Sequence, residues 1–100
     1  GSPPVITYFS PLNRSTYICT DIIYMSASAR DADNDPLEYR FIMDNSILRN
    51  WSAASRFNFK TSLNNRGRHR VLLEVRDKKG GKAARSSFIY IFRPMPKPGK

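Results

Sequence analysis

The sequence predicts an all-β fold, a sandwich or small barrel of about seven short antiparallel strands. Apolar and polar residues alternate along most segments, which is the pattern of strands with one buried face. Turn-forming residues recur at regular intervals between these segments, and no segment shows sustained helical periodicity. The chain has 100 residues, of which 40% are apolar. That is enough for one globular domain with a modest core.

The predicted strands follow one another with short turns between them. They are expected at 5–9, 22–30, 37–43, 47–51, 56–60, 69–76 and 87–92, with 47–51 either a short strand or an irregular crossing. Residues 13–16 have loop chemistry. Residues 1–4 and the Pro-rich segment 94–100 are expected to be linkers on either side of one domain at 5–93.

Several individual side chains have an expected place. Phe41, in the third strand, is expected at the centre of the core, and Cys19 is expected to be a buried small hydrophobe. Trp51 is expected to be buried or half-buried. His69 falls on an inward strand position and is expected to bond to the backbone. With a single cysteine, the chain forms no internal disulfide.

Two stretches resemble a known family. Ser26-Ala-Ser-Ala-Arg-Asp-Ala-Asp-Asn-Asp-Pro-Leu-Glu-Tyr-Arg-Phe41 resembles the second and third strands of PKD-type immunoglobulin-like domains, which carry an aspartate-rich turn, Pro-Leu and an aromatic strand. Gly67-Arg-His-Arg-Val-Leu-Leu-Glu-Val-Arg-Asp77 looks like their next-to-last strand. Trp51-Ser and Phe57-Asn-Phe are also similar to the bacterial three-tyrosine sensor modules. The resemblance implies an immunoglobulin-like sandwich in an extracellular or periplasmic multidomain protein at the cell surface.

The sequence departs from the PKD pattern at three places. Asp44-Asn-Ser46 stands where Gly-Asp-Gly usually follows the third strand, Phe41 stands where tryptophan is usual, and His69 replaces a tyrosine. These departures leave the fold inference in place and weaken any inference about a specific ligand.

An acidic turn is the first candidate site. It carries Asp31, Asp33 and Asp35, and in this kind of sandwich Asp77 is expected at the same end of the molecule. Four converging carboxylates would suit Ca²⁺, which binds six to eight oxygens. The alternative is that these carboxylates bond the backbone of their own turns and pair with neighbouring cations. No other cofactor is expected.

A basic surface is the second candidate site. The net charge is +9, which favours anionic partners. Alternation places Arg40, Arg68, Arg70 and Arg76 on one outward face, with Lys78 and Lys79 in the following hairpin. This face either binds an anion or a partner, or is a solvated surface with Glu38 and Glu74 as local partners. Nucleic acid binding would need outward aromatic rings among the charges, and Phe57 and Phe59 are expected inward.

The last strand, Phe88-Ile-Tyr-Ile-Phe92, is apolar on both faces. Such a surface needs a cover, which another domain, a second copy of the chain or a ligand would supply. No apolar run approaches the roughly 20 residues that span a bilayer.

The predicted function is that of a non-catalytic module, because the chain carries no motif for nucleophilic catalysis, phosphate binding or zinc. It would act as a spacer, or would bind a protein or an anionic glycan, inside a larger extracellular or periplasmic protein. The alternatives are a sensor or docking domain of a membrane-anchored receptor and, less favoured, a small basic nucleic-acid-binding domain.

Overall fold

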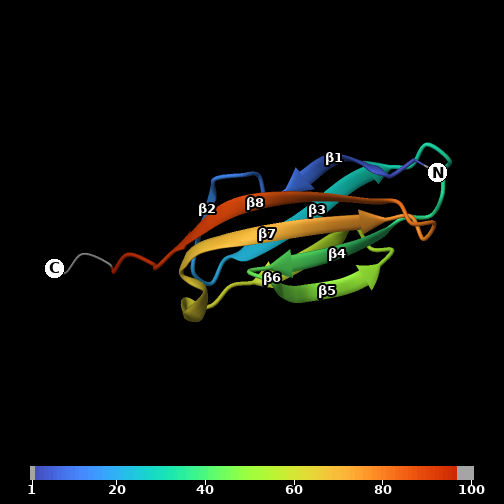
Figure 1. Cartoon of the computed structure of the whole chain (residues 1–100). Helices are drawn as coiled ribbons and strands as arrows, with labels where there is room; N and C mark the ends of the chain where they lie inside the picture. Colours follow the sequence, from blue (N-terminus) through green and yellow to red (C-terminus); the bar gives the residue numbers. More distant parts are fainter. Residues whose placement is uncertain (1, 97–100) are drawn as a thin grey trace.

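The computed structural model describes residues 2–96 and arranges them as two β-sheets packed face to face (Figure 1). Its strands are β1 (Val5–Ser10), β2 (Ser15–Ile18), β3 (Ile22–Arg30), β4 (Glu38–Met43), β5 (Ser46–Ser52), β6 (Arg56–Lys60), β7 (Gly67–Arg76) and β8 (Lys82–Phe92). The described part of the chain has no α-helix, and a single 3-10 turn, η1, lies at Leu63–Asn65.

The two sheets have the strand orders β1-β3-β6 and β2-β8-β7-β4-β5. Neighbouring strands are antiparallel, except that β2 runs parallel to β8. Without the short β2, seven strands remain: the first, second and fifth form one sheet, and the third, fourth, sixth and seventh form the other. The sixth lies between the third and the seventh, as in an immunoglobulin-like sandwich. The predicted fold class is therefore confirmed.

Alternating side chains from both sheets form the core. Phe41 on β4 is fully buried, and its ring lies 6.1 Å from the ring of Phe57 on β6, across the sandwich. Its buried neighbours come from almost every strand: Ile6, Phe9, Ile23, Met25, Tyr39, Met43, Val71, Leu73, Val75, Ile89 and Ile91. Phe57 and Phe59 pack against this core as predicted, and Cys19 is also buried.

The interpretation of residues 13–16 as loop is wrong for Ser15 and Thr16, which begin β2. This strand of four residues pairs only with β8, more than 70 residues further along the chain. Its backbone hydrogen bonds therefore go to a strand that is distant in sequence, and no local sequence pattern predicts them. β8 also begins at Lys82, five residues before the predicted start, because its hairpin with β7 stays in register up to Arg76. Segment 47–51 lies within the strand β5, whose pairing with β4 is interrupted by two register shifts.

The described chain enters and leaves the sandwich at opposite ends (Figure 1). Val5 pairs with Arg30, at the end that carries the β3–β4 and β7–β8 turns. At the other end, Cys19 donates its N–H to the carbonyl of Phe92, the last residue of β8. Residues 2–4 and 93–96 have no regular structure, and the rest of the predicted linkers, residues 1 and 97–100, lies outside the described residues.

Candidate functional site

The outward face of the five-stranded sheet carries most of the predicted basic residues. Its register places Arg68 beside Tyr90 and Arg70 beside Phe88 on the β7–β8 hairpin. Towards the other edge, Arg76 lies beside Glu38 and Arg40 beside Glu74. The prediction that these four arginines share one face is therefore correct, but the structure divides them into two unlike groups.

In the first group the charged side chains pair with one another. We call it the paired half, and it consists of Glu38, Arg40, Trp51, Glu74 and Arg76. Arg40 Nη2 lies 2.6 Å from Glu74 Oε1, and Arg76 Nη2 lies 2.9 Å from Glu38 Oε1. Both guanidinium groups also cover the half-buried ring of Trp51, at 4.7 and 4.2 Å from its centroid. Cation–π contact and ion pairing together occupy these two arginines.

The two predicted lysines are engaged as well. Lys78 Nζ lies 3.7 Å from Glu38 Oε2, and Lys79 Nζ lies 2.9 Å from Asp35 Oδ1. Four of the six residues predicted to bind an anion thus already have a carboxylate partner. For these four, the geometry matches the alternative of local ion pairs.

The second group remains open to solvent, and we call it the open half: Arg14, Ile18, Arg68, Arg70, Phe88, Tyr90 and Phe92. Three rings on β8 are 40 to 49% exposed, those of Phe88, Tyr90 and Phe92. The guanidinium of Arg68 lies 4.3 Å from the centroid of Phe88. Among residues 2–96, the ion pairs within 4.0 Å involve none of the three arginines of this half.

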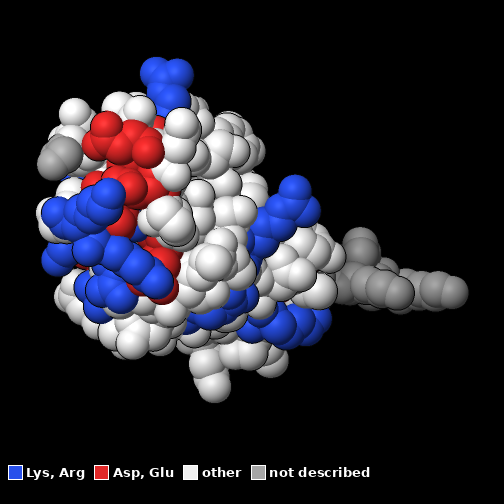
Figure 2. Space-filling model, turned by 90° about the vertical axis from the view of Figure 1, so that its right-hand side faces the viewer, with Lys and Arg blue, Asp and Glu red and all other residues white. Residues whose placement is uncertain are grey.

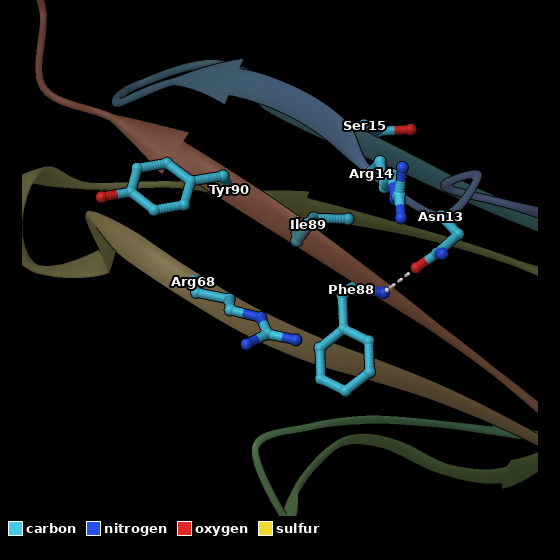
Figure 3. Close-up of a pocket in the computed structure, with 7 residues that line it drawn as sticks. All are labelled: Asn13, Arg14, Ser15, Arg68, Phe88, Ile89 and Tyr90. Atoms are coloured by element: carbon cyan, nitrogen blue, oxygen red, sulfur yellow. Dashed lines mark hydrogen bonds between the residues drawn. The ribbon is translucent and has the colours of Figure 1, made fainter.

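A shallow hollow of about 430 Å³ lies within the open half (Figure 3). Asn13, Arg14, Ser15, Arg68, Phe88, Ile89 and Tyr90 line it. The loop before β2 is fixed there, because Phe88 N donates to Asn13 Oδ1 at 2.8 Å and Arg14 N donates to the Phe88 carbonyl at 2.7 Å. The sequence of β8 predicts its exposed apolar face. Nothing in the local sequence points to Arg14, because β2 forms only by pairing with β8.

The acidic turn and the β7–β8 hairpin meet at one end of the molecule, where acidic side chains form a patch with basic ones directly beside it (Figure 2). Asp31 Oδ2 accepts hydrogen bonds from the N–H groups of Asp33 and Asp35, each at 3.0 Å. Asp77 Oδ1 accepts from the N–H groups of Lys79 and Gly81, each at 2.8 Å. Both buried carboxylates therefore hold turns in place, by the bonding typical of aspartate in turns.

The same hydrogen bonds shift the pKa values of Asp77 and Lys79 at this end of the molecule. The N–H of Lys79 holds the pKa of Asp77 below its ordinary value, against the effect of burial, and the N–H of Gly81 adds to the shift. The hydrogen bond to Asp35 raises the pKa of Lys79. The charged forms of Asp77 and Lys79 are thus favoured.

The predicted calcium site comes together in part. Asp31, Asp33 and Asp35 offer oxygens within 4.8 Å of one another, and Asp77 is not in this group. Asp31 Oδ1 is buried without a hydrogen-bond partner, which would suit a cation, whereas Lys79 already neutralises Asp35. Calcium binding at this turn stays a prediction, and the melting temperature in calcium and in chelator would test it.

His69 contributes to a local network. Its Nδ1 lies 2.5 Å from Asp44 Oδ2, and its Nε2 lies 2.5 Å from the carbonyl oxygen of Asn65. Burial raises the pKa of Asp44, but the N–H of Arg70 and the His69 ring outweigh it and hold this pKa below its usual value. With both ring nitrogens bonded, His69 fastens η1 to the β4–β5 turn, which agrees with the predicted bond to the backbone.

Known proteins similar to this chain are found by structure and not by sequence. No protein-family model matches it, and no curated protein matches it. The fibronectin(III)-like modules of CbhA from Clostridium thermocellum superpose with a TM-score of 0.75 at 13% identity, over 100% of this chain and 54% of theirs. Immunoglobulin domains 1–5 of Sidekick-1 give 0.64 at 20% identity, over 90% of this chain and 19% of theirs.

A third similar structure is SGBP-B of the mixed-linkage glucan utilization locus of Bacteroides ovatus, solved with a mixed-linkage heptasaccharide. It gives a TM-score of 0.66 at 18% identity, over 94% of this chain and 25% of that one. This chain therefore spans about half, or less, of each of these three structures. These likenesses define an immunoglobulin-like β-sandwich. Among residues 2–96, no helix is long and apolar enough to cross a membrane.

Proposed function

We propose that this chain is a non-catalytic module of a larger extracellular or periplasmic protein, in which it holds neighbouring domains apart. One observation carries the proposal: the described chain enters the sandwich at one end and leaves it at the other (Figure 1). β8 has 11 residues, and at about 3.4 Å per residue it spans about 37 Å. A module joined in series would therefore separate its neighbours by about that length.

The similar solved structures support a modular role. In each of them the matching fold is one part of a longer chain. One of them is a glucan-utilization protein solved with a heptasaccharide, and it favours a parent protein that handles carbohydrate. The aspartate-rich turn between β3 and β4, followed by Pro36 and Leu37, supports kinship with PKD-type domains within the immunoglobulin-like class.

A replacement experiment in the full-length parent protein tests this function. The module is either deleted or exchanged for an unrelated immunoglobulin-like sandwich of the same end-to-end length. A spacer predicts that deletion impairs the parent's activity and that the exchange restores it, because only the separation of the neighbours matters. If deletion leaves the activity unchanged, or if an epitope-tagged parent is found in the cytosol, the proposal is wrong.

A further inference from the structure

The open half has the composition of a binding surface for a negatively charged ligand. It combines three arginines for which no ion pair within 4.0 Å is found among residues 2–96 with three aromatic rings that are 40 to 49% exposed. Monomeric proteins rarely leave an apolar patch of this kind without a use. We propose that the open half binds an acidic polysaccharide, whose carboxylate or sulfate groups contact the arginines while a sugar ring lies on the side chains of Tyr90 and Phe92.

The arginines are placed to receive anionic groups. The exposed guanidinium of Arg68 lies 4.3 Å from the centroid of the Phe88 ring on the neighbouring strand, a contact that holds it in place on this face (Figure 3). Arg70 lies one outward position further along β7 and is exposed, as is Arg14 on the neighbouring loop. A planar guanidinium pairs with carboxylates through two parallel hydrogen bonds, which favours acidic sugars over neutral ones.

The aromatic rings supply the apolar part of the surface. The rings of Tyr90 and Phe92 pack against each other, with centroids 4.5 Å apart and planes tilted by 41°. Ile18 on β2 pairs with Phe92 and is 52% exposed, so it extends this surface across to the next strand. The carbon-bound hydrogens on the face of a sugar ring carry a slight positive charge, which the negative face of an aromatic ring attracts.

The same geometry disfavours a single-stranded nucleic acid. Bases need flat, accessible rings on which to stack one after another. Here the Arg68 guanidinium covers Phe88, and Tyr90 and Phe92 form one tilted pair, which offers an apolar contact to a single sugar ring but no row of rings for successive bases. The choice of a glycan also rests on the extracellular or periplasmic location in the proposed function.

Binding of the purified chain to defined polymers tests the proposal. The probes are polygalacturonate for carboxylates, heparin for sulfates, neutral mixed-linkage β-glucan, and a single-stranded oligothymidylate, each titrated at 50 and 200 mM salt. We expect binding to polygalacturonate or heparin that weakens with salt, and none to the neutral glucan. The double variant Arg68→Ala/Arg70→Ala should lose roughly tenfold or more in affinity, and Tyr90→Ala should lose several-fold.

A matched control removes the same charge elsewhere. The double variant Arg30→Ala/Arg56→Ala takes two exposed arginines from the opposite, three-stranded sheet and should bind almost as well as the natural chain. All four substituted arginines are exposed, so melting temperatures should change little. Equal losses in the two double variants would mean that net charge alone attracts the polymer, and the proposal would be overturned.

Three other results would also overturn it. They are binding to neither acidic polysaccharide, tighter binding to the oligothymidylate than to either of them, and a concentration-dependent dimer that Tyr90→Ala abolishes. The last would make a second copy the occupant of the open half. None of these results touches the exchange experiment in the parent protein, so a failed glycan site and a failed spacer role are distinguishable.

Discussion

The paired half and the open half of the five-stranded sheet both combine arginines with aromatic rings, but only the paired half also contains carboxylates. In the paired half, Arg40 and Arg76 each contact one carboxylate and both cover Trp51. In the open half, Arg68 covers Phe88, and Arg68 takes part in none of the ion pairs found among residues 2–96. An arginine over an aromatic ring is thus common to both halves. The halves differ in whether a carboxylate also pairs with that arginine.

The difference follows from the neighbouring strands. β7 lies between β4 and β8, and outward positions of β4 carry Glu38 next to Arg76 and Arg40 next to Glu74. The outward positions of β8 nearest Arg68 and Arg70 are Tyr90 and Phe88, which bring rings and no charge. A basic strand is therefore neutralised over one part of its length and left available over the other.

The largest expected difference between the halves is in stability. Trp51→Ala removes a half-buried ring that two guanidinium groups cover, and we expect a loss of about 2 kcal/mol in the free energy of unfolding. Phe88→Ala removes a ring that is 40% exposed and should cost less than about 1 kcal/mol. Urea unfolding of both variants measures the difference, and equal losses would contradict the division into two halves.

Removing the carboxylates should make the paired half resemble the open half. We expect Glu38→Gln/Glu74→Gln to release Arg40 and Arg76 and to bind heparin more tightly, at a cost of about 0.2–1 kcal/mol in stability per ion pair. Asp33→Asn changes the net charge by one unit at an exposed position outside both halves, and it is the control for the single variants Glu38→Gln and Glu74→Gln. If this control gains as much affinity, the ion pairs do not shield the arginines.

Acid should weaken the molecule through one carboxylate beside each half. Asp77 anchors the hairpin next to the paired half, and Asp44 bonds to Arg70 and His69 near the open half. The pKa of each lies below its ordinary value. Their contribution is therefore complete above the unfolded-state pKa of about 3.9 and is lost as the pH falls through the lower, folded-state pKa.

Urea midpoints between pH 6 and pH 2 follow this loss. Asp77→Asn should flatten the acid decline more than Asp44→Asn does, because Asp77 is only 3% exposed whereas the Asp44 side chain is 49% exposed. A decline in Asp77→Asn as steep as in the natural chain would show that other carboxylates cause the acid sensitivity.

Much of this architecture is predictable from local sequence. The alternation of β4 and β7 predicts that Phe41, Val71, Leu73 and Val75 face inward, and all four are buried. It also predicts the shared outward face of Arg40, Arg68, Arg70 and Arg76 and names Glu38 and Glu74 as partners. A period of two residues fixes which side of a strand each residue occupies, whatever the strand pairs with.

The candidate site could be predicted only in part. The sequence predicts Arg68 and Arg70 together with Arg40 and Arg76 as one basic face, although only the first two belong to the open half. Arg14 and Ile18 could not be found, because β2 acquires its strand structure from hydrogen bonds to β8, whose residues come more than 70 positions later. Tyr90 and Phe92 were recognised as apolar excess, but their role depends on which charges lie next to them.

The sequence by itself determined an all-β sandwich, its inward and outward faces, and a surplus of arginine on one of those faces. Only the tertiary structure decided which arginines meet a carboxylate and which meet an aromatic ring. The physical reason is that a side chain's face depends on its own strand, whereas its partners depend on the register of a neighbouring strand that the chain reaches only after folding.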